Sequence, residues 1–193
     1  AAFVNFGSER HGFLPLKELS NEFYTNGADG KRKCILKEGD EILVQVLKEE
    51  RGTKGAALSN QISLAGRFIV LIPNSEKSGG VSRRIAGEER DEIKNALSEL
   101  DIPEGMSVIV RTAGLGRTAE ELKWDLDYLM NLWGQINSTV DDAPSPSLIY
   151  KDDKLILRVF RDYFRDDIEE ILIDDQEVHA EALDFAKSVI PDH

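Results

Sequence analysis

The chain has 193 residues, 41% of them hydrophobic, and its 36 Asp and Glu against 24 Lys and Arg give a formal net charge of −12; this predicts one or two globular domains with a substantial core. This acidic total argues at first against nucleic acid as a partner. However, residues 1–60 and 61–117 are each electrically balanced, and the whole acidic excess lies in residues 118–193. The first 117 residues could therefore carry a local basic face. The single cysteine excludes a disulfide framework, and with only three histidines it argues against a metal site. No apolar run reaches the roughly 20 residues of a membrane span, so we expect a cytoplasmic protein.

Short strands and turns dominate the first third of the chain. The pattern predicts a strand at residues 1–7, a short apolar segment at 12–16, a helical turn at 17–24, an exposed loop at 25–33 and extended segments at 41–47 and 55–64. Several short strands with glycine-rich turns are typical of a small antiparallel barrel.

Strands and helices alternate from residue 67 onward. We expect strands at 67–72 and 106–110, helices at 88–100 and 118–136, a linker at 141–147, and then a helix at 154–165, a strand at 170–173 and a helix at 176–189. Thr118 and Glu121 form a capping-box pattern at the start of the longest helix. The alternation predicts an α/β unit distinct from the barrel, which makes the chain a mixed α+β protein.

Two phenylalanines and a lysine in the barrel segment are candidates for contacts to bases and phosphate. Exposed aromatic rings on a barrel face stack on bases, and a nearby lysine holds phosphate. Phe3 and Phe13, with Lys54 in a turn, match this composition. From the residues alone, we favour the alternative that both rings belong to the core.

A second candidate lies where the 106–110 strand ends in Arg111 and Thr112, followed by a glycine-rich turn and a helix start. An arginine fork, a hydroxyl and exposed backbone N–H groups can together bind a phosphate. The segment lacks the Gly-Lys-Ser/Thr ending of a P-loop. An ordinary strand-to-helix turn is the alternative that the residues alone favour. Residues 79–84 add a second glycine- and arginine-containing segment, which could equally be a solvated loop.

Four pairs of adjacent aspartates raise the question of a Mg²⁺ site for phosphodiester cleavage. They are at residues 141–142, 152–153, 166–167 and 174–175. Adjacent side chains point in different directions on a helix or strand, so sequence neighbours do not by themselves make a site. A solvated acidic face is the favoured interpretation.

Several blocks of sequence, in order along almost the whole chain, resemble the ribonuclease E/G family of bacterial endoribonucleases, and the E branch more than the G branch. The blocks are AAFV (1–4), ERHGFLPLK (9–17), KEERG (48–52), KGAAL (54–58), ISLAG (62–66), GVSRRI (80–85), IVRTAG (109–114) and FRDY (160–163).

The resemblance implies three domains. Residues 1–60 are expected to form an OB-fold RNA-binding domain of the S1 type that lacks its first strand, residues 61–156 a 5′-sensor domain, and residues 157–193 part of an RNase H-like domain. The resemblance also implies, against both alternatives favoured above, that RNA contacts Phe3, Phe13 and Lys54, that Arg111 and Thr112 hold a 5′-monophosphate, and that Gly66 and Val70 contact the 5′ nucleotide.

The resemblance further implies a parent enzyme that cuts single-stranded RNA in mRNA turnover and in rRNA and tRNA processing. Its tetramer, its catalytic Mg²⁺ and linking Zn²⁺, its degradosome partners and any association with the inner membrane are expected to depend on regions outside these residues. This segment is therefore expected to bind RNA carrying a 5′-monophosphate, to cut none and to hold no metal. The alternative is a protein-interaction module whose acidic tail, residues 118–193, docks a basic partner.

Overall fold

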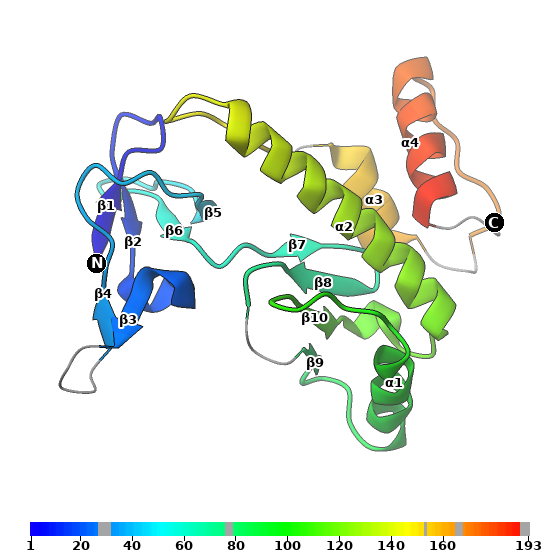
Figure 1. Cartoon of the computed structure of the whole chain (residues 1–193). Helices are drawn as coiled ribbons and strands as arrows, with labels where there is room; N and C mark the ends of the chain where they lie inside the picture. Colours follow the sequence, from blue (N-terminus) through cyan, green and yellow to red (C-terminus); the bar gives the residue numbers. More distant parts are fainter. Residues whose placement is uncertain (27–31, 76–78, 153, 165–167, 190–193) are drawn as a thin grey trace.

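A computed structural model describes residues 1–26, 32–75, 79–152, 154–164 and 168–189 (Figure 1). Its first sheet has four short strands in the order β1-β2-β6-β5. The strands are β1 (Ala2–Val4), β2 (Gly12–Leu14), β5 (Gln45–Lys48) and β6 (Ala57–Ser59). Leu14 and Leu58 are buried on one face of this sheet, as expected where alternate residues face a core.

Two single-turn helices and a two-stranded sheet complete the first segment. The predicted helical turn at 17–24 is confirmed as 3-10 helices η1 (Leu16–Glu18) and η2 (Asn21–Phe23). The predicted exposed loop at 25–33 is wrong at its ends, since β3 (Tyr24–Asn26) and β4 (Arg32–Cys34) pair antiparallel; its centre, 27–31, lies outside the described residues. The guanidinium of Arg32 lies 4.3 Å from the ring centre of Tyr24, which supports this pairing.

The predicted antiparallel barrel needs correction. The strands that the model describes form no closed barrel, and β2 pairs with β6 in parallel, with Phe13 opposite Ala57. The expected strand at 41–47 begins only at Gln45. Periodicity indicates that a segment is extended, but the direction in which it pairs is a long-range property.

A second four-stranded sheet lies at the centre of the molecule (Figure 1). Its order is β7-β8-β10-β9, with β8 antiparallel to β10 and β9 parallel to it. Its strands are β7 (Leu64–Ala65), β8 (Ile69–Ile72), β9 (Gly80–Val81) and β10 (Ser107–Val110). Ile69, Leu71, Val108 and Val110 are buried, in one hydrophobic cluster with residues of α2.

Helix α2 (Ala119–Asp142) runs across this sheet, and α1 (Glu88–Ser98) packs beside it (Figure 1). The predicted capping box is confirmed, because Thr118 Oγ1 accepts from the Glu121 N–H at 3.2 Å and Glu121 Oε2 accepts from the Thr118 N–H at 2.9 Å. The helix extends to Asp142, so the predicted linker at 141–147 begins two residues too early.

Helices α3 (Leu155–Tyr163) and α4 (Gln176–Val189) form a third cluster around Phe160 and Phe185. Tyr128 of α2 contacts Phe185 edge-on, with ring centres 5.3 Å apart. The strand expected at 170–173 is wrong, since residues 168–173 are irregular. None of the helices in the described ranges is both long and apolar enough to cross a membrane.

Candidate functional site

A buried carboxylate organises the loop between β7 and β8. Asp125 of α2 is fully buried, and its two oxygens accept the backbone N–H groups of three consecutive residues: Arg67 at 3.0 Å, Phe68 at 2.8 Å and Ile69 at 2.9 Å. Burial raises the pKa of Asp125, while these hydrogen bonds and the charge of Arg111 act in the opposite direction. The loop backbone is thereby tied to a helix more than 50 residues away.

Gly66 is required by this arrangement. A Cβ atom at this position would lie 2.7 Å from the Asp125 carboxyl carbon, and Asp125 is held by three hydrogen bonds. The Gly66 N–H bonds the Ile69 carbonyl at 2.8 Å, which closes the loop. The loop carbonyls of Gly66 and Arg67 are left facing the end of β10.

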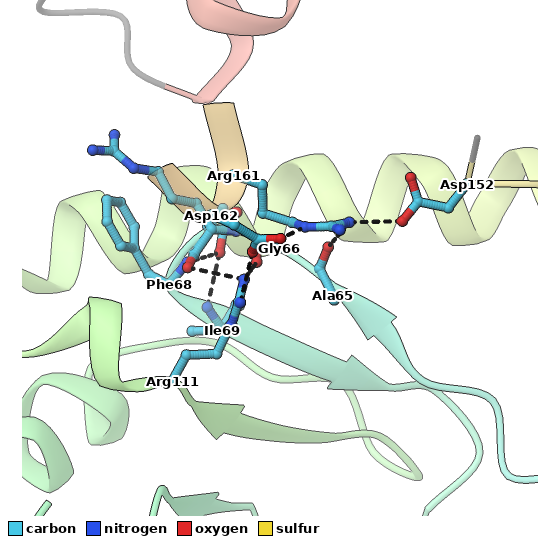
Figure 2. Close-up of polar contacts among 10 residues, drawn as sticks. Ala65, Gly66, Phe68, Ile69, Arg111, Asp152, Arg161 and Asp162 are labelled. Carbon is cyan, nitrogen blue, oxygen red and sulfur yellow. Dashed lines mark hydrogen bonds and ion pairs between the residues drawn. The ribbon is translucent and has the colours of Figure 1, made fainter. Parts of the chain in front are cut away.

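Arg111, the residue after β10, points its guanidinium at this loop (Figure 2). Nη1 donates to the Gly66 carbonyl at 2.5 Å and to the Arg67 carbonyl at 3.4 Å. The Arg111 backbone N–H bonds the Phe68 carbonyl at 2.8 Å. The structure therefore brings together two residues predicted for the 5′ site: Arg111, which follows β10, and Gly66, in the loop between β7 and β8.

The second end of the guanidinium meets a carboxylate from α3. Arg111 Nη2 lies 2.7 Å from Asp162 Oδ1, and the two side chains point toward one another in Figure 2. Partial burial alone would raise the pKa of Asp162, but the hydrogen bond from Arg111 and the charges of Arg161 and Arg111 lower it below its usual value. The Asp162 carboxylate is therefore ionised at neutral pH.

Arg161, next to Asp162, ties α3 to the same loop region. Its Nη1 reaches Asp152 at 2.8 Å and the Ala65 carbonyl at 3.3 Å, and its Nε lies 3.5 Å from Asp162. Asp152 and the α3 residues Arg161 and Asp162 therefore form a charged cluster beside the start of the loop at residues 66–68, called the Gly66 loop below.

Thr112 and Val70 border the site. Thr112 is exposed and begins the 3-10 turn η3 (Thr112–Gly114). Val70 is half-buried in β8, directly opposite Ile109. A Cβ atom on Gly114 would lie 2.9 Å from the Phe68 carbonyl, so this close approach of the turn to the loop requires glycine.

Sequence reasoning missed two parts of the site. One is the pair of carboxylates, Asp125 and Asp162. The other is Arg67, whose guanidinium lies between the rings of Phe68 and Phe164, 4.6 Å and 4.9 Å from their centres. Only Asp125 had a local signal, because its spacing from Leu122 and Leu129 places an acid on the apolar face of α2.

The aromatic pair of the first sheet is exposed. Phe3 and Phe13 lie opposite one another on β1 and β2, with ring centres 5.9 Å apart in an edge-on arrangement, and are 71% and 43% exposed. The alternative that both belong to the core is therefore wrong. Lys54 is exposed in the Arg51–Lys54 turn that leads into β6; this turn adjoins β2, because a Cβ atom on Gly55 would lie 2.6 Å from the His11 carbonyl.

The aspartates of these acidic pairs that lie in the described ranges are dispersed over several elements. Asp141 and Asp142 end α2, Asp152 pairs with Arg161, and Asp175 accepts backbone N–H groups at the start of α4. Residues 153, 166 and 167 lie outside the described ranges. Among the residues that the model covers, no group of three His, Cys, Asp or Glu side chains could hold a metal ion. Arg83 and Arg84 of the second glycine-containing segment are exposed.

Comparison with known proteins shows which family the two parts of the chain resemble. Residues 1–60 match the S1 RNA binding domain, and residues 63–193 match the Ribonuclease E/G family. The chain is 51% identical to ribonuclease E of Haemophilus influenzae over all of its length and 52% identical to ribonuclease E of Escherichia coli over 92% of its length. Ribonuclease G of Haemophilus influenzae is 32% identical over the whole chain.

The chain spans 21%, 17% and 40% of the lengths of these three relatives. Its higher identity to the ribonuclease E sequences confirms the expected likeness to the E branch. Because the family model covers residues 63–193, well over half of the chain, and the S1 model covers residues 1–60, the chain belongs to the ribonuclease E/G family.

Proposed function

We propose that this chain is the region of a bacterial endoribonuclease that binds single-stranded RNA and senses its 5′-monophosphate, in an enzyme of mRNA turnover and rRNA and tRNA processing. The first segment would bind the RNA strand, and the site around Arg111 its 5′ end. The observation that carries the proposal is the placement of Arg111: its guanidinium is held by the carbonyls of the loop between β7 and β8, and the next residue along the chain, Thr112, is exposed.

Three features of this site suit a phosphate. A guanidinium is a planar, permanently charged donor that can make paired bonds to phosphate oxygens. Its orientation is fixed, since Nη1 is bound to loop carbonyls and the loop is bound to Asp125. Thr112 adds a hydroxyl donor in an exposed position, and Gly66 supplies the carbonyl that holds Arg111. We further propose that the 5′ nucleotide contacts Gly66 and the half-buried Val70.

The test compares the binding of short single-stranded RNAs that differ only at the 5′ end. We expect tighter binding of the 5′-monophosphate than of the 5′-hydroxyl or 5′-triphosphate form, measured by fluorescence anisotropy at a fixed salt concentration. Equal affinity for the monophosphate and hydroxyl forms would rule out 5′-end sensing by this chain, while leaving RNA binding by the first segment intact.

The exposed aromatic pair gives a separate prediction for RNA-strand binding. Phe13→Ala should weaken the binding of 5′-hydroxyl RNA by about 1–3 kcal/mol, because a base loses its stacking platform. Leu16→Ala, which removes another exposed apolar side chain from the same segment, is the control and should change affinity little. If both variants bind RNA like the wild type, bases do not stack on this pair.

Lys54 separates RNA binding from the acidic-docking alternative. Log affinity for RNA should fall linearly with log salt concentration, and Lys54→Ala should make that slope shallower by about 1, since one phosphate contact is lost. A protein that instead docks basic partners through residues 118–193 would bind RNA weakly and would be unaffected by Lys54→Ala.

We also propose that cleavage in the parent enzyme uses Mg²⁺, and subunit linking uses Zn²⁺, through regions outside residues 1–193. Because the chain spans 21% and 17% of its ribonuclease E relatives in Haemophilus influenzae and Escherichia coli, most of the length of those relatives lies outside the matched region. Mg²⁺-dependent cleavage of RNA by the highly purified chain, abolished by Asp166→Asn with Asp167→Asn, would contradict it.

A further inference from the structure

We propose that Asp162 is an internal competitor for the phosphate site, so that a 5′-phosphate binds Arg111 only by displacing this carboxylate. The inference rests on the proposed function of Arg111 and adds the residue that sets its affinity and its selectivity. The ion pair that carries it is the 2.7 Å contact between Arg111 Nη2 and Asp162 Oδ1.

Asp162 holds the end of the guanidinium that a phosphate needs. Nη1 is already engaged by the carbonyls of Gly66 and Arg67. A guanidinium can bind two oxygens side by side through Nη1 and Nη2 or through Nε and Nη2, and both modes use Nη2. A phosphate in either mode would therefore place an oxygen on the atom that Asp162 now contacts.

The charges make sharing unfavourable. The Asp162 carboxylate is ionised, and a bound monophosphate would carry up to two further negative charges within a few ångströms of it. Arg161 offsets part of this repulsion, but its Nη1 is committed to Asp152 and its Nε lies 3.5 Å from Asp162. The contact between Asp162 and Arg111 must therefore open for a dianion to bind.

The position of Asp162 allows this exchange. The side chains of Arg111 and Asp162 are 29% and 32% exposed, so both are reached by solvent, and breaking an exposed ion pair costs little. Asp162 lies next to Tyr163, the last residue of α3, so its release does not require the helix to unwind. A 5′-triphosphate carries more negative charge than a 5′-monophosphate, so the Asp162 carboxylate should repel it more strongly.

The experiment measures the affinities of wild type and Asp162→Asn for the three RNAs described above. Asp162→Asn should bind 5′-monophosphate RNA about tenfold more tightly, bind 5′-triphosphate RNA with a still larger gain, and leave 5′-hydroxyl RNA unchanged. In the Arg111→Ala background, Asp162→Asn should give no gain. Asp152→Asn is the matched control, because it removes one negative charge from a residue that pairs with Arg161. The change in its RNA affinity measures the general effect of losing a charge in this cluster.

The outcomes separate the inference from the proposed function. If wild type prefers the monophosphate and Asp162→Asn binds it equally or more weakly, Asp162 orients Arg111 and the inference is overturned while the sensor function stands. A gain of equal size for 5′-hydroxyl RNA, or for Asp152→Asn, also overturns it. If wild type does not prefer the monophosphate, the sensor function itself fails, whatever the affinities of Asp162→Asn. Asp162→Ser serves as a second variant, should Asp162→Asn unfold below the assay temperature.

Discussion

Replacing Asp125 with leucine is expected to lower the free energy of unfolding by about 3–5 kcal/mol, because three buried N–H donors lose their acceptor. The donors belong to Arg67, Phe68 and Ile69, and the carboxylate that accepts them is fully buried. Leucine has the branching of aspartate but larger terminal groups, so the loss of hydrogen bonds and overpacking of the buried site both contribute to this value. Urea unfolding followed by circular dichroism gives the free energy, and amide exchange by NMR reports the three donors directly.

Asp127→Asn is the matched control for this change. Asp127 lies two residues further along α2, is exposed, and pairs across one helical turn with the exposed Lys123. Its loss should change stability by no more than about 0.5 kcal/mol. If Asp125→Leu is as stable as the wild type and the three amides remain protected from exchange, the role assigned to Asp125 is wrong.

Arg111→Ala is expected to weaken the binding of 5′-monophosphate RNA by about 10- to 100-fold, which corresponds to the loss of charge-assisted hydrogen bonds worth about 1.5–3 kcal/mol. Affinity for 5′-hydroxyl RNA should stay within about twofold, because the strand-binding face lies on another sheet. Arg111→Lys should fall between wild type and alanine, since lysine retains the charge but not the planar fork.

Two controls make the Arg111 result specific. Lys94→Ala removes a cation from the exposed face of α1, where it contacts only Asp91 among the residues described, and it should leave the 5′-end preference intact. Thermal unfolding of Arg111→Ala tests for damage to the Gly66 loop, which Arg111 also bonds. Equal losses for 5′-monophosphate and 5′-hydroxyl RNA in a folded variant would make Arg111 a structural residue and not a phosphate ligand.

Local signals in the sequence predicted the helices well. The helix at 176–189 was predicted at its observed bounds, and the start of α2 followed from its capping box, which depends on residues only three apart. The end of α2 was predicted too early, at Ile136. The apolar stripe weakens there, but Val140 still packs on the core, and the helix continues to Asp142. It stops at Ala143, which is extended and precedes Pro144.

Strands were predicted less well, because a strand is defined by its partner. Residues 170–173 have the β-branched composition of a strand but pair with none of the described strands. The 41–47 segment is extended in pattern, yet only its last part joins β6. The parallel contact between β2 and β6, which the barrel prediction missed, links residues more than 40 positions apart.

The sequence by itself determined the residues that can bind RNA chemically: an arginine and threonine before a glycine-rich turn, and two phenylalanines with a lysine in a segment of short strands. The resemblance to a family then favoured the RNA-contact interpretation of these residues over the core and ordinary-turn interpretations. Only the tertiary structure decided that both rings are exposed, that Asp125 organises the loop on which Arg111 rests, and that Asp162 holds the free end of that arginine. The physical reason is range: capping and periodicity act over a few residues, whereas these contacts join segments about 50 residues apart, whose meeting depends on the packing of α2 and α3 against the sheet.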